Sequence, residues 1–180
     1  MDIRWQNTIQ IDRPIEQVYA YLADFPRHAE WALTLVRLEQ VQPGDKNGLG
    51  AQYLTYERQA MHPDRQPFEK LTKGMAAKTM CEVQELIPNQ RIVWRAYMAP
   101  KTGLRSNLSF ELTPAPGGGT LLKQAIFFHI PALLALMFRL RYGGGLDRKM
   151  QTQADAGLRN IKTILEQTHA RPHSHGPNSA

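Results

Sequence analysis

The chain has 180 residues, with 42% hydrophobic and 21% charged residues, which are ordinary proportions for one globular domain. Its N-terminus lacks the profile of a secretory signal, and no apolar run is long enough to span a membrane. The single cysteine, Cys81, excludes an internal disulfide framework and a metal-binding cysteine pair. We therefore expect a soluble, cytoplasmic protein.

The net charge of +6 makes nucleic acid a partner to test. Between positions 91 and 146 the only acidic residue is Glu111. The basic residues of that stretch are Arg91, Arg95, Lys101, Arg105, Lys123, Arg139 and Arg141. Most fall on the polar positions of predicted strands, and no nucleic-acid-binding motif accompanies them. We expect the solvated outer face of a sheet and no nucleic acid, with anionic lipid or an acidic partner as the alternative.

The first element is a strand over 3–11, because its odd positions are apolar apart from Asn7 and its even positions are polar. Pro14 then marks a first helical turn. Ile15, Val18 and Leu22 recur at helical spacing, and the run ends at Pro26. A short helical turn over 26–31 follows.

Six more stretches read as strands, and turn residues such as Asn47-Gly48 and Pro88-Asn89 separate several of them. The predicted strands are 33–41, 51–60, 78–86, 91–98, 104–112 and 120–129. Together with the first strand they predict a seven-stranded antiparallel meander, because nearly all the connections are short.

Near residue 146 the spacing of apolar residues changes from that of a strand to that of a helix. Leu146, Met150, Ala154, Leu158 and Ile161 form an apolar stripe of a helix that runs to about residue 168. One amphipathic helix and one curved sheet need each other to bury their apolar faces. We therefore predict a single domain over 1–168 and a disordered tail over 169–180, which is rich in Pro, Ser and His.

The stretch from Ile9 to Trp31 resembles the entry motif of a known superfamily. That motif has an apolar strand end, an early proline, a Val-aromatic pair, an Asp-aromatic step and a tryptophan. Here these are Ile11, Pro14, Val18-Tyr19, Asp24-Phe25 and Trp31. The segments 48–50 and 85–94 are similar to two later landmarks. Over about residues 3–168 the chain resembles the START-related (SRPBCC) superfamily, in its polyketide cyclase/dehydrase and lipid-transport branch.

The resemblance implies an α+β helix-grip fold, in which a curved seven-stranded antiparallel sheet wraps around the long C-terminal helix, with two short helices after the first strand. Members hold a hydrophobic small molecule such as a lipid, quinone or polyketide in a cavity between sheet and helix. The chain is thus expected to bind such a molecule for transport or sequestration. Two alternatives stay open, because one scaffold serves several functions: a polyketide cyclase/dehydratase-type enzyme, and a co-chaperone-like interaction domain.

We expect the ligand to contact inward positions of the strands and of the long helix. These positions are Trp5, Asn7, Tyr53, Thr55, Trp94, Leu108, Phe110, Ile126, Phe128, Met150 and Ala154. Core packing is the alternative for each aromatic side chain. Asn7 needs a partner within its apolar face, and a bond to neighbouring backbone is the commoner solution. A β-bulge would exchange the two faces downstream of it.

A second distinctive segment covers 130–142, where the sequence is apolar all round from Ala132 to Phe138. Three glycines follow and form a natural hinge. One interpretation is a lid that contacts an anionic membrane surface through residues 130–149. The other is a helix packed on the mouth of the sheet, or a dimer contact. The expected lid or gate residues are Trp31, Leu134, Phe138 and Gly144.

No group of residues is typical of a catalytic or metal site. Cys81 has no histidine in clear sequence relation to it, and three of the six histidines lie in the tail. We therefore predict no catalytic residue, no metal and no cofactor. If the chain is a cyclase, the available polar groups are Asn7, Tyr53, Arg95 and Tyr97.

Overall fold

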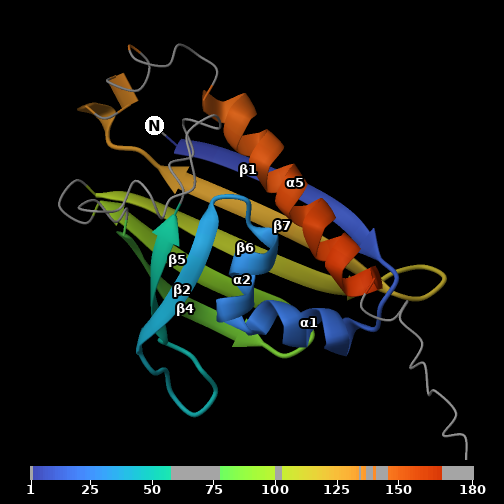
Figure 1. The fold of residues 1–180 in the computed structure, drawn as a ribbon. Coiled ribbons are helices and arrows are strands. Elements are labelled where there is room, and N and C mark those ends of the chain that lie inside the picture. Colours follow the sequence, from blue (N-terminus) through green and yellow to red (C-terminus); the bar gives the residue numbers. More distant parts are fainter. Residues whose placement is uncertain are drawn as a thin grey trace, which may run out of the picture.

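The computed structural model describes residues 2–57, 78–99, 103–133, 135–136, 140 and 146–167. In these residues one antiparallel sheet of seven strands is covered on a single face by helices (Figure 1). The strands are β1 (Asp2–Ile11), β2 (Leu35–Gln42), β3 (Gln52–Glu57), β4 (Lys78–Ile87), β5 (Arg91–Ala99), β6 (Leu104–Pro114) and β7 (Thr120–His129). The helices are α1 (Ile15–Ala23), the 3-10 turn η1 (Phe25–Arg27), α2 (His28–Trp31) and α5 (Leu146–Gln167).

The strand order β1-β7-β6-β5-β4-β3-β2 follows the chain except at its start, where β1 pairs with the last strand. Because β1 and β2 lie at opposite edges, the segment between them, α1 to α2, has to cross the sheet (Figure 1). We call the face covered by α1, α2 and α5 the inner face, and the opposite one the outer face. The predicted α+β fold is confirmed, and the expected strands agree with the observed ones to within a few residues.

Some predicted features lie partly or wholly outside the described residues. The strand expected over 51–60 is described as far as Glu57, and the tail over 169–180 is not described. None of the described helices is long and apolar enough to cross a membrane. The cytoplasmic location stays a prediction.

Strand register places residues from all over the sheet in rows on the inner face, because residues paired in a ladder point to the same side. One such row contains Trp5, Ile126, Leu108, Trp94 and Val83. A register shift after Val83 inserts one residue into β4. The shift keeps the row intact and lets Leu86 pair with Ile92, which is fully buried.

The hydrophobic core lies between the inner face and the helices. From the sheet it takes fully buried Ile92 and Phe110, and from the helices Leu22 and Ile161. Burial of such side chains supplies most of the favourable free energy of folding, at about 25 cal/mol per Å² of apolar surface.

The C-terminal end of α5 is fixed to the segment that follows β1. Arg13 donates from Nε to the carbonyl oxygen of Leu165 at 2.9 Å and from Nη2 to that of Glu166 at 2.6 Å. The last carbonyls of a helix have no partner within it, so this arginine acts as a cap from another element. Glu166 in turn accepts from the backbone N–H of Asp12 at 2.8 Å. These contacts set where the long helix ends on the sheet.

Candidate functional site

Aromatic rings gather on the inner face where η1 and α2 meet β3, β5 and β6. Phe25 stacks on Tyr53 with ring centroids 5.1 Å apart and contacts Trp94 edge-on at 5.8 Å. Trp94 also packs against Phe110 at 5.4 Å. Burial raises the pKa of the Tyr53 phenol, so that this group is neutral at physiological pH. The cluster forms an apolar wall with a phenol at one side.

His28 lies inside this cluster and is only 2% exposed. Its ring is 4.8 Å from that of Phe25 and 5.2 Å from that of Trp94, centroid to centroid. Nε2 lies 2.8 Å from the carbonyl oxygen of Leu22, which only accepts, so Nε2 carries the proton. Burial lowers the pKa of His28 to about 4, against the opposite effect of this hydrogen bond. At neutral pH the imidazole is therefore uncharged.

Trp31 fills the space between α5 and the sheet. Its ring lies 5.8 Å from that of Phe110, centroid to centroid, and the side chain is 6% exposed. Asn160 of α5 donates to the Trp31 carbonyl oxygen at 3.0 Å. The indole Nε1 is buried and has no hydrogen-bond partner in the part of the chain that the structure describes. The gate role expected for Trp31 stays a prediction, and the residue's position is that of a wedge inside the core.

A polar contact joins the edge strand β1 to the long helix. Asn7 donates from Nδ2 to Oδ1 of Asp155 on α5. The sequence favoured neighbouring backbone as the partner of Asn7, but the partner is a carboxylate 148 positions away. Sequence spacing alone does not show which residue of the helix faces β1. Next to this contact, Trp5 packs edge-on against Phe128 at 5.4 Å.

Three small side chains lie side by side on neighbouring strands of the inner face. Cys81, Ala96 and Ser106 are in register on β4, β5 and β6, and we call them the small-residue row. Tyr53 on β3 and Phe128 on β7 continue the row at its two ends. The row therefore presents short side chains towards the helices, between the larger side chains of Tyr53 and Phe128.

Ser106 is the unusual member of the small-residue row. It is 1% exposed, and its hydroxyl has no hydrogen-bond partner among the described residues. A buried polar group without a partner costs free energy, so each such case calls for an explanation. Thr55, on another inner-face position, shows the usual solution, since its hydroxyl donates to the Thr79 carbonyl oxygen at 3.1 Å.

The residues predicted to contact the ligand occupy inner-face positions where the structure describes them. Those on strands are Trp5, Asn7, Tyr53, Thr55, Trp94, Leu108, Phe110, Ile126 and Phe128. Ala154 is half-buried on α5, and the Met150 side chain lies outside the described residues. Leu134, Phe138 and Gly144, expected as lid residues, also lie outside them. The ligand-binding and lid roles stay predictions.

Three buried residues on or beside this face were not predicted from the sequence: Ser106, Gln124 and His28. Ser106 and Gln124 are polar residues at inward positions of otherwise apolar alternations, and both are buried. A polar residue at an inward position breaks the alternation, and this break could have marked both as candidate site residues. His28 gave no comparable signal, because a four-residue helix such as α2 is too short for a periodicity. Within the described residues, no three His, Cys, Asp or Glu side chains are placed to hold a metal ion.

The arrangement defines a helix-grip domain, with one long helix held by a single antiparallel sheet. The profile of the family described as "Polyketide cyclase / dehydrase and lipid transport" matches residues 2–166. The chain therefore belongs to this family, and the resemblance inferred from its sequence motifs is confirmed. A comparison with curated proteins gave no match.

Solved structures share the fold at low sequence identity. The Zhui aromatase/cyclase from Streptomyces sp. R1128 has a TM-score of 0.69 and 14% identity, over 98% of this chain and 100% of that one. A START superfamily protein from Mycobacterium smegmatis has a TM-score of 0.66 and 11% identity, over 92% and 98%. The di-domain aromatase/cyclase StfQ of the steffimycin pathway has a TM-score of 0.66 and 14% identity, over 95% and 53%. At this identity the neighbours show the fold alone, and it is the family match that supports a hydrophobic ligand-binding domain.

Proposed function

We propose that the protein binds an elongated, mostly apolar small molecule against the inner face and carries or sequesters it. The observation that carries the proposal is the Ser106 hydroxyl, which is buried among apolar neighbours without a hydrogen-bond partner. A ligand oxygen above the small-residue row would supply that partner. The family match and the aromatic wall support the same conclusion.

The strand positions of Ser106 and of Phe110, on which Trp31 packs, indicate the kind of ligand. Ser106 and Phe110 lie four residues apart on β6, which corresponds to about 13 Å along a strand. The indole of Trp31, whose N–H also lacks a partner, packs on Phe110. A hydroxyl can donate or accept, whereas an indole N–H only donates. The matching molecule is long and flat, with a carbonyl or hydroxyl oxygen near each end.

The decisive experiment starts from the protein purified out of its own host. Native mass spectrometry followed by organic extraction should show a bound apolar molecule, and adding that molecule back should raise the melting temperature of stripped protein. A protein that never retains a small molecule, and that no apolar compound stabilises, would contradict the proposal. A carrier returns its ligand unchanged after incubation, whereas a cyclase/dehydratase would return a product lighter by one water.

Two matched variants test whether the ligand lies on the inner face. Ala96→Leu fills the centre of the small-residue row and should abolish retention of the ligand. Ala125→Leu, which adds the same side chain to the outer face of β7, two strands away, should leave retention unchanged. Because overpacking can unfold a protein, Ser106→Ala is the milder test. It should keep the fold and weaken binding by about fivefold to tenfold, the loss of one hydrogen bond.

We further infer that residues 130–149 bring the protein to an anionic membrane surface, where an apolar ligand would be exchanged. Leu133, Leu136 and Leu140 are exposed by 72%, 55% and 79%. Their spacing of three and four residues is that of side chains on one side of a helix. Arg148 is exposed nearby in the chain, and Arg139 and Arg141 add positive charge. Leucines beside arginines are typical of a segment that lies on a membrane.

A further inference from the structure

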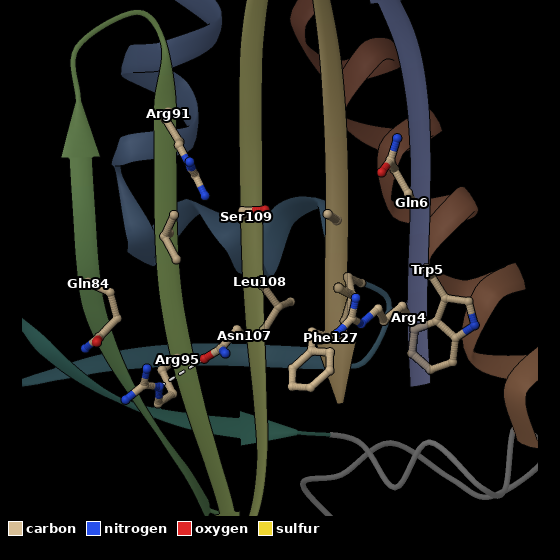
Figure 2. Close-up of a pocket in the computed structure, with 13 residues that line it drawn as sticks. Arg4, Trp5, Gln6, Gln84, Arg91, Arg95, Asn107, Leu108, Ser109 and Phe127 are labelled. Atoms are coloured by element: carbon tan, nitrogen blue, oxygen red, sulfur yellow. Dashed lines mark hydrogen bonds between the residues drawn. The ribbon is translucent and has the colours of Figure 1, made fainter. Parts of the chain in front are cut away.

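The outer face of the sheet carries a groove of about 550 Å³ (Figure 2). It crosses the strands from β4 to β1 and lies on the opposite side from the helices and from the proposed ligand. Outer sheet faces are normally covered by long side chains, so a depression there has a local cause. The cause is a row of paired residues whose middle members have short side chains.

The floor of the groove is formed by Val93, Ser109 and Ala125, which are in register on β5, β6 and β7. The two rows beside it hold longer side chains. One contains Arg95, Asn107, Phe127 and Arg4, and the other begins with Arg91. Ser109 and Ala125 are too short to fill the space between these rows.

Three guanidinium groups stand around this floor. Figure 2 shows Arg91 turned towards Ser109, Arg95 beside Asn107, and Arg4 beside Phe127. None of the described residues that line the groove is an aspartate or a glutamate. Of the nearby carboxylates, Glu111 accepts from Lys123 at 2.8 Å, whereas Glu85 lies 3.4 Å from Nε of Arg91, so that Arg91 already has one acidic partner.

The hydrogen bonds on this face leave donors at its surface. Arg95 donates from Nε to Oδ1 of Asn107 at 2.9 Å, which uses the acceptor of that amide. The NH₂ groups of Asn107 and of Arg95 remain as donors. The Arg4 guanidinium lies 5.1 Å from the centre of the Phe127 ring, a cation–π contact that orients it while its N–H groups stay at the edge. Such a surface matches a ligand that only accepts.

We propose that the groove binds an elongated organic dianion, with two carboxylate or phosphate groups held by different arginines and a flat apolar middle resting on Ala125 and Phe127. Arg91 and Arg95 lie four residues apart on β5, or about 13 Å along the strand, so one small anion cannot engage both fully. A rigid molecule with two acidic groups can engage both arginines at the same time. The groove is a second site on the outer face, although Trp5, Leu108 and Ile126 of the inner-face row also border it.

The test uses naphthalene-2,6-dicarboxylate as the probe, with the corresponding bisphosphate, the monocarboxylate and neutral naphthalene-2,6-dimethanol as comparisons. At low salt the dicarboxylate or the bisphosphate should bind most tightly, and their order identifies the preferred acidic group. The dimethanol should bind least, and added salt should weaken the dianions most. In NMR spectra the side-chain NH₂ signal of Asn107 should shift, while the indole N–H signal of Trp31, buried on the other face, should not.

Arg4→Gln and Arg95→Gln should each weaken binding of the dianion by about fivefold, in line with one partly exposed charged contact. The matched control is Arg37→Gln, because Arg37 also stacks on an outer-face aromatic, Tyr56 at 4.0 Å, but lies outside the groove. Ala125→Glu should abolish binding by placing a carboxylate on the floor. The proposal would be overturned if wild type and both groove variants bound the dianion equally well, or if Arg37→Gln weakened binding as much as they do. It would also be overturned if the probe shifted the indole N–H signal of Trp31 but not the side-chain NH₂ signal of Asn107.

Discussion

Gly157 of α5 lies directly against the indole ring of Trp31. A Cβ atom added at Gly157 would be 3.3 Å from Cε3 and 3.4 Å from Cζ3 of that ring. This is closer than ordinary van der Waals contact, so the glycine allows the helix to approach the wedge residue. The contact holds α5 to α2, and through Phe110 to the sheet.

Enlarging Gly157 should therefore destabilise the protein in proportion to size. Gly157→Ala should change the free energy of unfolding by less than about 1 kcal/mol, because the gain in helix propensity offsets a contact that is a few tenths of an ångström too close. Gly157→Leu should cost about 2–3 kcal/mol through overpacking. Urea unfolding measures both. Arg159→Leu adds a leucine to the exposed side of the same helix and should stay within about 0.5 kcal/mol of wild type.

Stability should fall on mild acidification because of His28. Its pKa is about 4 in the folded protein and near 6.5 when unfolded, so the unfolded chain binds the proton more tightly. The stability that depends on a neutral His28 is fully present above pH 6.5 and is lost as the pH falls towards 4. Between pH 8 and pH 5 the loss is about 2 kcal/mol by linkage. Urea unfolding at a series of pH values measures it.

The His28→Phe variant separates this effect from general acid destabilisation. It keeps a ring within the aromatic cluster and removes the titrating group, so its stability should change less between pH 8 and pH 5 than that of wild type. His129→Gln, which replaces an exposed histidine that lies beside Asp2 at 3.0 Å, serves as the control. Identical pH profiles for wild type and His28→Phe would show that His28 is not responsible.

Two hydroxyls on the inner face should respond in opposite ways to removal in the ligand-free protein. Ser106→Ala should leave stability unchanged or raise it by up to about 1 kcal/mol, because the hydroxyl it removes is desolvated and has no partner. Thr55→Val removes a hydroxyl that donates to Thr79 and should cost about 1 kcal/mol. Thermal unfolding checks both. A loss for Ser106→Ala equal to that for Thr55→Val would mean that Ser106 has a structural partner.

The fold could be predicted because its determinants are local. The alternation in β1, the early Pro14 and the stripe of α5 each specify one element, and short turns leave an antiparallel sheet as the arrangement. The alternation also predicted which residues of the strands point inwards. The register shift in β4 begins after Val83, so Val83 and its partner Trp94 stay on the inner face.

The details of the site could not be predicted, because they depend on contacts between distant segments. Asn7 finds Asp155 only when α5 lies across β1, and the small-residue row exists only once β4, β5 and β6 are in register. The outer-face groove is a further case. Arg91 and Arg95 were predicted to lie on the solvated face, but the short Ser109 and Ala125 between the rows of long side chains become visible only in the assembled sheet.

The exposed leucines should control membrane binding. Flotation with vesicles that contain anionic lipid should carry the wild-type protein upward, and flotation with neutral vesicles should carry much less, because basic residues near a leucine surface add electrostatic attraction. Replacing Leu133, Leu136 and Leu140 together by serine should abolish flotation without lowering stability, since these side chains are exposed in the folded protein. Leu49→Ser, at a leucine 43% exposed elsewhere, should float like wild type. Equal and negligible flotation of the wild type with both kinds of vesicle would remove the membrane from the proposed function, and ligand exchange would then take place with another protein.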